Sequence, residues 1–206
     1  MIPFFKPTYD PDFLPELEEV LKSGWITTGP KTKLFEQRIT EYCGHKRTLC
    51  LGSATSGLEL ILRWFGVGEG DEVILPAYTY CATANVVVHC GAKPVFVEVD
   101  SSFNMSVEDI KAKITPHTKV VMPVDFAGLP CDYDAINAWL EEEKVRSMFQ
   151  PATKEQEALG RILVLSDAAH SLGATYKERR TGTLADISVF SFHAVKNLTT
   201  AEGGAI

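Results

Sequence analysis

The segment ILVLSDAAHS, residues 162–171, passes from an apolar run through a single serine to an aspartate and then a histidine. A short, continuous apolar run is typical of a strand that is covered on both faces, as in a parallel sheet. We therefore predict a buried strand over residues 162–166, with Asp167 and His170 presented at its carboxyl end.

Similar β-rich stretches alternate with helical patterns along nearly the whole chain. The predicted strands cover residues 47–51, 72–75, 94–99, 119–124, 162–166 and 187–191. The predicted helices cover residues 11–22, 55–65, 82–89, 107–114 and 133–145. This alternation predicts an α/β domain with a largely parallel sheet.

Residues 141–160, EEEKVRSMFQPATKEQEALG, form the one compositionally distinct segment. The segment is rich in charge, contains Pro151 and is followed closely by an apolar run. We interpret it as a helix end followed by an exposed, mobile excursion. The alternative is a partner-binding insertion.

The composition is that of an ordinary globular protein. The 206 residues are 45% hydrophobic and 23% charged, with a net charge of −7. These values exclude disorder, collagen and coiled coil as the main organisation. An acidic chain without a basic block is not expected to bind nucleic acid. We also expect no membrane insertion, because no apolar run approaches the roughly 20 residues of a membrane span.

The five cysteines are an odd number and contain no C-x-x-C pair. They lie among apolar or helical neighbours, which predicts reduced thiols. Because the N-terminus also lacks the apolar core of a signal peptide, we expect a cytoplasmic protein. His89 and Cys90 are adjacent, but no second ligand pair has zinc spacing, so we expect no metal site.

A candidate nucleophile lies in residues 186–204, DISVFSFHAVKNLTTAEGG. Here a predicted strand leads Ser191 into a turn, and Lys196 follows shortly after. Burial lowers the pKa of a lysine, and the free amine condenses with an aldehyde to form a Schiff base. The alternative is an ordinary surface lysine.

Asp167 and His170 add a second candidate. A carboxylate at the end of a buried strand is costly unless it meets a cation, and a pyridinium nitrogen would be such a cation. His170 could hydrogen-bond the same ring. The alternatives are a helix N-cap for Asp167 and a satisfied, half-buried histidine for His170.

Two further segments follow predicted strands. Residues 51–57, LGSATSG, begin an amphipathic helix and leave backbone N–H groups free for a phosphate. Residues 76–85 carry Tyr78 and Tyr80, of which one could stack on a flat cofactor. The alternatives are a plain N-cap and a core aromatic. All these pieces fall at the carboxyl ends of strands, where open α/β sheets bind ligands.

The glycines of residues 66–71 precede a strand, so we interpret them as a turn and not as a dinucleotide loop.

With these residues in view, the chain resembles the DegT/StrS group of sugar-nucleotide aminotransferases. These are pyridoxal-phosphate (PLP) enzymes of fold type I in the aspartate aminotransferase superfamily. The resemblance covers essentially the whole chain and rests on residues 24–30, 70–74, 76–85, 123–128, 167–173 and 188–204. It implies a three-layer αβα large domain with a mostly parallel sheet.

The resemblance implies a role for each residue around the cofactor ring. Lys196 matches the lysine that holds the cofactor and shuttles the proton, and Asp167 matches the partner of the pyridinium nitrogen. Tyr80, in preference to Tyr78, matches the aromatic residue stacked on the ring. His170 stands where the family places a Gln or His beside the ring.

At the phosphate, Thr55 and Ser56 match the residues whose backbone amides bind the group, and Ser191 matches its hydroxyl ligand. Two nearby positions depart from the family pattern, because Ala54 and Ala201 stand where glycine is usual. A third departure is Asp125, which stands where a histidine is common, so the contacts to the sugar are left open.

The resemblance implies that residues 1–206 form an N-terminal arm and a PLP-binding large domain, without the small C-terminal domain of the family. Ala205 and Ile206 resemble the first residues of a further strand, so we expect an incomplete protein. The resemblance also implies a homodimer with shared active sites.

The expected function is the transfer of an amino group, with glutamate as the expected donor, to a keto-sugar nucleotide. Such a product enters cell-surface polysaccharide or other amino-sugar biosynthesis. One alternative is a PLP-dependent sugar dehydratase, although those relatives replace the lysine at position 196 with histidine. Another is a truncated, non-catalytic remnant or a regulatory cofactor-binding protein. The retention of Lys196, Asp167 and Ser191 argues against that reading.

Overall fold

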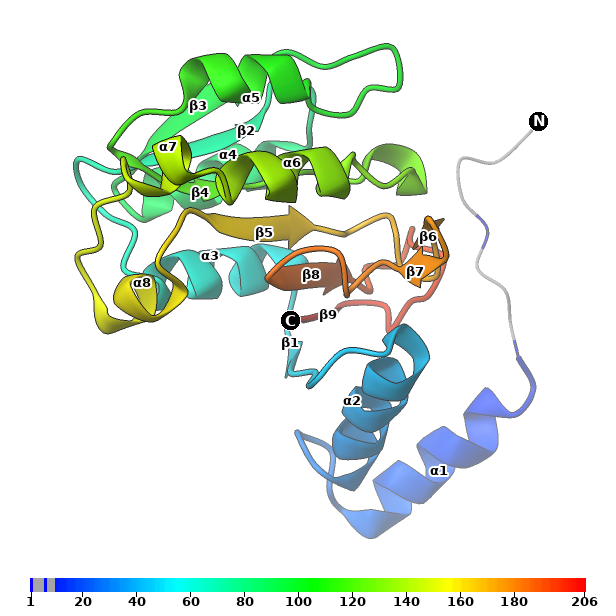
Figure 1. Ribbon diagram of the computed structural model, residues 1–206. Helices are drawn as coiled ribbons and strands as arrows, with labels where there is room; N and C mark the ends of the chain where they lie inside the picture. Colours follow the sequence, from blue (N-terminus) through cyan, green and yellow to red (C-terminus); the bar gives the residue numbers. More distant parts are fainter. Residues whose placement is uncertain (2–5, 7–9) are drawn as a thin grey trace.

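A seven-stranded sheet, in the order β1-β9-β8-β5-β4-β2-β3, runs through the computed structural model (Figure 1). The structure describes residue 1, residue 6 and residues 10–206. The strands of this sheet are β1 (Cys50–Leu51), β2 (Glu72–Pro76), β3 (Lys93–Val97), β4 (Thr118–Val121), β5 (Leu163–Asp167), β8 (Ile187–Ser191) and β9 (Gly204–Ala205). β9 runs antiparallel to β1 and β8, and the remaining neighbours pair in parallel. The predicted mostly parallel sheet is confirmed.

Helices cover both faces of this sheet. The connection from β2 to β3 moves toward one edge, whereas those from β3 to β4 and from β4 to β5 move back across the sheet. Right-handed crossovers therefore put α4 (Cys81–His89) on one face, and α5 (Val107–Lys113) and α6 (Tyr133–Leu140) on the other. α3 (Ala54–Trp64) packs against α4, and α5 packs against α6. The result is a three-layer αβα domain (Figure 1).

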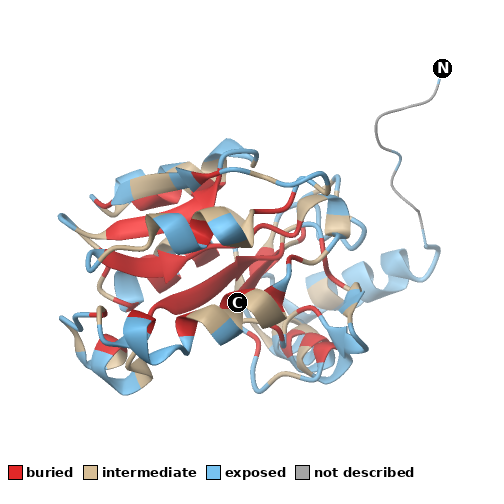
Figure 2. Cartoon of the chain, turned by 45° about the horizontal axis from the view of Figure 1, so that its top comes forward, coloured by how far each residue is buried: buried red, intermediate tan, exposed pale blue. Residues whose placement is uncertain are grey.

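The central strands form the core. Every residue of β2, β4 and β5 is buried, so the continuous apolar runs of the sequence lie between two helical layers (Figure 2). β5 ends at Asp167, one residue later than predicted, and β8 has the predicted bounds.

Several elements were not predicted from the sequence. They are α2 (Pro30–Cys43), α8 (Lys154–Leu159) and a hairpin of β6 (Thr175–Tyr176) and β7 (Arg179–Arg180). α2 lies with α1 (Phe13–Ser23) beside the β1 edge of the sheet (Figure 1). Within the described ranges, no helix is both long enough and apolar enough to traverse a bilayer.

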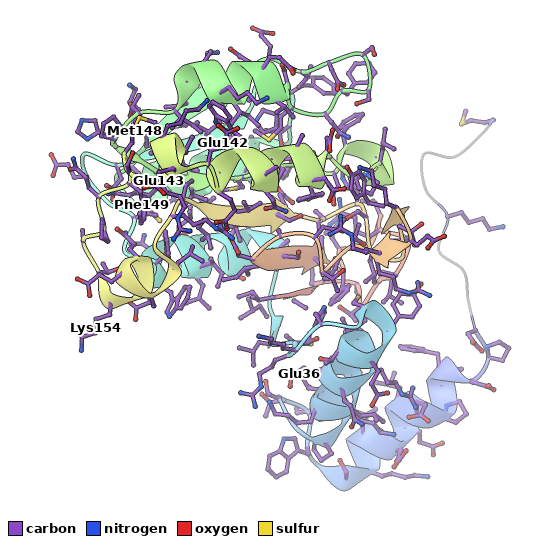
Figure 3. The ribbon with its side chains drawn as sticks, viewed as in Figure 1. Glu36, Glu142, Glu143, Met148, Phe149 and Lys154 are labelled. Carbon is purple, nitrogen blue, oxygen red and sulfur yellow. The ribbon has the colours of Figure 1, made fainter. Side chains whose placement is uncertain are left out.

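α2 protects this edge of the sheet. Glu36, which Figure 3 shows on α2, is buried, and its Oε1 accepts a hydrogen bond from the Cys50 amide of β1 (2.9 Å). The Glu36 carboxylate thus accepts a hydrogen bond that a neighbouring strand would otherwise accept. This edge of the sheet is therefore less available for pairing with a strand of another chain.

The segment 141–160 is packed onto the domain, so the prediction of an exposed excursion is wrong for its buried side chains. It contains α7 (Glu143–Arg146) and α8, and Val145 and Phe149 belong to the main core. Gln156 is fully buried, and its Nε2 donates to the carbonyl of Phe65 (2.7 Å), the C-cap residue of α3. Lys154 points away from the body of the molecule (Figure 3). The segment therefore anchors the far end of α3.

Candidate active site

A cavity of about 640 Å³ opens where the strands end. Its walls come from segments that follow β1, β2, β4, β5 and β8, as expected for a ligand site of an open α/β sheet. The sequence-predicted residues that line it are Thr55, Tyr80, Asp167, His170, Ser191 and Lys196. Ser56 does not line it.

Asp167 and Lys196 interact electrostatically in this cavity. Burial raises the pKa of the Asp167 carboxyl, because the charged form is poorly solvated, and the Lys196 charge opposes this rise only in part. Burial also lowers the pKa of the half-buried Lys196 amine, against the opposing effect of Asp167. Burial therefore favours the uncharged form of both groups, and the free amine of Lys196 is the form that can react with an aldehyde. In the part of the chain that the structure describes, no basic side chain forms a salt bridge with Asp167.

Thr83 is a site residue that the sequence reasoning missed. It is fully buried in α4, and its Oγ1 donates a hydrogen bond to Asp167 Oδ2 (2.9 Å). The hydroxyl of Thr79, a cavity residue, lies 2.8 Å from that of Thr83. The available signal was a pair of threonines four residues apart at the start of a predicted helix, with Thr79 in the turn before α4 and Thr83 within it.

The start of α3 provides an anion cradle. The N-cap Ser53 accepts a hydrogen bond from the Ser56 amide through Oγ (3.1 Å), and its carbonyl accepts from the Gly57 amide (3.2 Å). The amides of Ala54 and Thr55 have no acceptor among the described residues, as is usual in the first turn of a helix. The geometry thus makes Ala54 and Thr55 available for a phosphate, whereas the Ser56 amide is already engaged.

β9 lies directly against this cradle. A Cβ atom on Gly204 would come within 2.5 Å of the Ala54 nitrogen and the Ser53 carbonyl carbon. Ser191 pairs with Gly204 across β8 and β9, so Ser191 lies at the same end of the sheet as the start of α3. Only glycine allows this close approach of β9 to the helix start.

The two tyrosines have different surroundings. The Tyr78 ring packs against Phe103 and Phe126, with centroids 5.3 and 5.0 Å apart. The Tyr80 ring is 75% exposed and lines the cavity, which leaves its face free for a flat ligand. His170 lines the same wall with part of its ring exposed, and the partial burial of the ring, followed by the Lys196 charge, lowers its pKa.

Asp125 and Ala201, two of the departures from the family pattern, have structural roles. Asp125 is buried and accepts hydrogen bonds from Ser171 Oγ (2.7 Å), Tyr133 Oη (2.9 Å) and the Cys131 amide (3.0 Å). It therefore lies behind the cavity wall. Ala201 has a φ of 68°, a left-handed conformation that favours glycine.

Outside residues 2–5 and 7–9, no group of three or more His, Cys, Asp or Glu side chains is placed to hold an ion. The His89 ring of the adjacent His-Cys pair instead contacts Glu59, with Nδ1 and Oε2 3.1 Å apart.

The DegT/DnrJ/EryC1/StrS aminotransferase family model matches residues 7–206. The chain belongs to this family. Its fold is thus that of the fold type I PLP aminotransferases, in agreement with the resemblance seen in the sequence.

Several known proteins are similar to this chain in sequence or in structure. Spr1654 from Streptococcus pneumoniae, described as a sugar aminotransferase, is 49% identical in its PMP form, with a TM-score of 0.95 over 99% of this chain and 51% of Spr1654. The spore coat polysaccharide biosynthesis protein SpsC from Bacillus subtilis is 38% identical over 206 residues, all of this chain and 49% of SpsC. PseC from Helicobacter pylori, an aminotransferase involved in the biosynthesis of pseudoaminic acid, is 31% identical, with a TM-score of 0.85 over 98% of this chain and 51% of PseC. The chain spans about half the length of these relatives.

Pyridoxal 5′-phosphate is the cofactor of the DegT family, and Spr1654 has been solved with both PLP and PMP. The residues of this cavity fit that group. Asp167 is a buried carboxylate without a cationic partner at salt-bridge distance among the described residues, which suits a ring nitrogen that carries a proton. The free amides of Ala54 and Thr55 suit the phosphate, and Lys196 suits the aldehyde.

Proposed function

We propose that the protein is a PLP-dependent aminotransferase that moves an amino group from glutamate to a keto-sugar nucleotide. One observation carries the proposal: a lysine with a lowered pKa and a buried aspartate, Lys196 and Asp167, line the same cavity. The sugar and polysaccharide roles given for Spr1654, SpsC and PseC support the substrate class.

Each site residue has a chemical task in this proposal. PLP, when bound, supplies an electron-withdrawing ring that stabilises negative charge on a reacting carbon. Asp167 keeps the proton on the ring nitrogen, because a buried carboxylate favours a nearby cation. Lys196 Nζ takes the proton from the α-carbon of the donor and later returns one to the sugar carbon. Tyr80 and the start of α3 hold the ring and the phosphate in place.

The proposal extends to the domain organisation, the oligomeric state and the cellular location of the protein. We propose that residues 1–206 are the N-terminal arm and PLP-binding large domain of a homodimer. α1 buries none of its residues, and Phe13, Leu14 and Leu21 on it are more than half exposed, so a partner subunit has an apolar surface to cover. All five cysteines are free, which supports a reducing, cytoplasmic environment.

Borohydride reduction tests the proposal. The protein that carries this chain is purified with PLP, reduced, and digested for peptide mass spectrometry. We expect the cofactor mass on Lys196. Lys196→Ala should bind PLP without covalent attachment and should lose activity. Lys177→Ala, at an exposed lysine paired with Asp134, is the control and should behave as wild type.

Kinetics then tests the substrate class. We expect the PLP form to convert glutamate to 2-oxoglutarate, and the PMP form to aminate a keto-sugar nucleotide. An adduct on another lysine, such as Lys31 or Lys177, would overturn the assignment. Loss of water from the sugar instead of amination would favour the dehydratase. Absence of both reactions, with PLP bound, would favour a regulatory protein.

A further inference from the structure

Two threonine hydroxyls form a chain that ends on the buried carboxylate of the site. Thr83 Oγ1 lies 2.9 Å from Asp167 Oδ2, and Thr79 Oγ1 lies 2.8 Å from Thr83 Oγ1. Thr83 has no exposed surface, and Asp167 is 6% exposed, so bulk water does not compete for these contacts.

The direction of the hydrogen bonds follows from the number of protons available. An ionised carboxylate only accepts, so Thr83 must donate its single hydroxyl proton to Asp167. Thr83 can then only accept from its other neighbour, and Thr79 must donate to it. The chain therefore runs from Thr79 through Thr83 to Asp167, and each bond polarises the next.

This chain also fixes how the carboxylate is turned. Oδ2 is tied to α4 through Thr83, and Oδ1 accepts from the Ala169 amide (3.3 Å) on the loop after β5. With one oxygen held from each side, the plane of the carboxylate is set before a ligand arrives. A preorganised acceptor of this kind requires no reorientation when a charge is placed beside it.

The chain favours the ionised form of Asp167. Burial raises the pKa of this carboxyl, and the Thr83 hydroxyl is the strongest of the groups that oppose the rise, ahead of the Ala169 amide and Lys196. Without the Thr83 hydroxyl, the balance shifts toward the neutral acid. A neutral acid cannot hold a proton on the pyridine nitrogen by charge.

We propose that Thr83, oriented by Thr79, is a positioning residue that keeps Asp167 ionised and correctly turned toward the ring nitrogen of the cofactor. The inference rests on PLP binding in this cavity and goes beyond the proposed reaction. It assigns a function to Thr83 in α4 and to Thr79 in the turn before it. From the sequence, this segment was expected to contribute only the aromatic ring of a tyrosine to the site.

The test compares four variants of the full-length protein loaded with PLP labelled with ¹⁵N in its ring. Thr83→Val keeps the shape and removes the hydroxyl, Thr83→Ser keeps the hydroxyl, and Thr79→Val removes the second donor. Thr118→Val is the matched control, because Thr118 is equally buried and its Oγ1 accepts from the Thr115 amide (3.0 Å) at the opposite end of the sheet. The ¹⁵N chemical shift reports the protonation of the ring nitrogen, and denaturant unfolding reports stability.

We expect the Thr83→Val shift to move toward that of the unprotonated ring at neutral pH. Its kcat should fall roughly tenfold to hundredfold, the usual effect of a lost hydrogen bond to a charged group, with little change in KM for the donor. Thr83→Ser should resemble wild type. Thr79→Val should move the shift in the same direction by less, and Thr118→Val should lose stability without any change in shift.

A Thr83→Val protein that keeps the wild-type shift and kcat, and loses only stability as Thr118→Val does, would overturn the inference. Should Thr83→Val not fold, the half-buried Thr79 decides, and an unchanged shift in Thr79→Val would equally overturn it. A protonated ring nitrogen together with no amination of sugars would count against the proposed substrate and not against Thr83.

Discussion

The backbone amide of Asp125 donates a hydrogen bond to the carbonyl of Asp167 (3.2 Å), so two buried acidic residues are joined across neighbouring strands. Val124 forms the adjacent bridge with Asp167. The carboxylate of Asp125 is satisfied by three donors, yet burial still raises its pKa from 3.8 to about 6. An ionised Asp125 therefore lowers the free energy of unfolding.

The raised pKa of Asp125 predicts how the stability of the protein depends on pH. Asp125 binds its proton more tightly in the folded state, so the free energy of unfolding should fall as the pH rises from about 4 to about 6 and then level off. The raised pKa of Asp167 acts in the same direction. Urea unfolding at several pH values measures the slope.

Asp125→Asn should remove most of that slope. The amide oxygen can still accept from the Cys131 amide and Tyr133, and the amide nitrogen can donate to Ser171 Oγ. We expect a gain of up to about 3 kcal/mol at pH 7, the equivalent of a pKa that rises from 3.8 to about 6. Glu178→Gln, at an exposed site, is the control. A less stable Asp125→Asn protein would show that the charge strengthens these bonds by more than burial costs.

Gln156→Leu should destabilise the protein. The change removes the shorter of two hydrogen bonds to the Phe65 carbonyl, which keeps that from Thr153 Oγ1 (3.2 Å), and it leaves the Ala152 amide, now bonded to Gln156 Oε1 (2.9 Å), without an acceptor. A buried polar group that loses its partner costs about 1–3 kcal/mol. Glu157→Ala, on the exposed side of α8, should change the free energy of unfolding by less than about 0.5 kcal/mol. Equal effects of the two changes would mean that the segment does not anchor α3.

Gly204→Ala should weaken PLP binding at least tenfold. The new methyl group would lie 2.5 Å from backbone atoms of Ser53 and Ala54, which cannot move aside as a flexible side chain would. The start of α3 must then shift, and its free amides shift with it. Gly52→Ala is the matched control, since a Cβ there meets nothing within 4 Å. Titration of the apoprotein with PLP measures both, and equal affinities would contradict the prediction.

Ala201→Gly should stabilise the protein by about 1 kcal/mol, because a left-handed φ of 68° is strained for alanine and free for glycine. The same substitution at Ala138, an exposed position inside α6, should cost about 1 kcal/mol. Thermal unfolding of the two variants should therefore give changes of opposite sign. Changes of the same sign would show that the turn after Lys196 carries no such strain.

The sequence predicts the centre of the sheet well because β2, β4 and β5 are buried along their whole length. Residues 162–165 are apolar without interruption and predict β5, whereas β8 is predicted although Ser188 interrupts its apolar residues. α2 is different, since it buries only Glu36, Ile39 and Cys43 among mostly polar residues, and its periodicity is weak. α8 lies in a charged stretch and is held by Gln156, a polar residue that no hydrophobic pattern reveals.

The residues of the site could be predicted where they directly follow strands, because chain order alone brings strand ends to one edge. The contact of Thr83 with Asp167 depends on how α4 packs beside β5, and nothing local to either residue encodes it. The engaged Ser56 amide likewise depends on the rotamer of Ser53. The burial of Asp125 depends on three donors from the segments that follow it in the chain.

The position of β9 between β1 and β8 has a consequence for biosynthesis. Cys50 pairs with Ala205, and Leu51 pairs with Gly204, so the strand that leads into the phosphate cradle gains its neighbour from a segment much later in the sequence. Contacts between such distant segments form late, since a long loop must close first. On the ribosome, the cradle therefore stays unsupported until the last of these residues has left the exit tunnel. We expect a nascent chain to capture its cofactor only after that point, which makes cofactor uptake a marker of the insertion of β9 between β1 and β8.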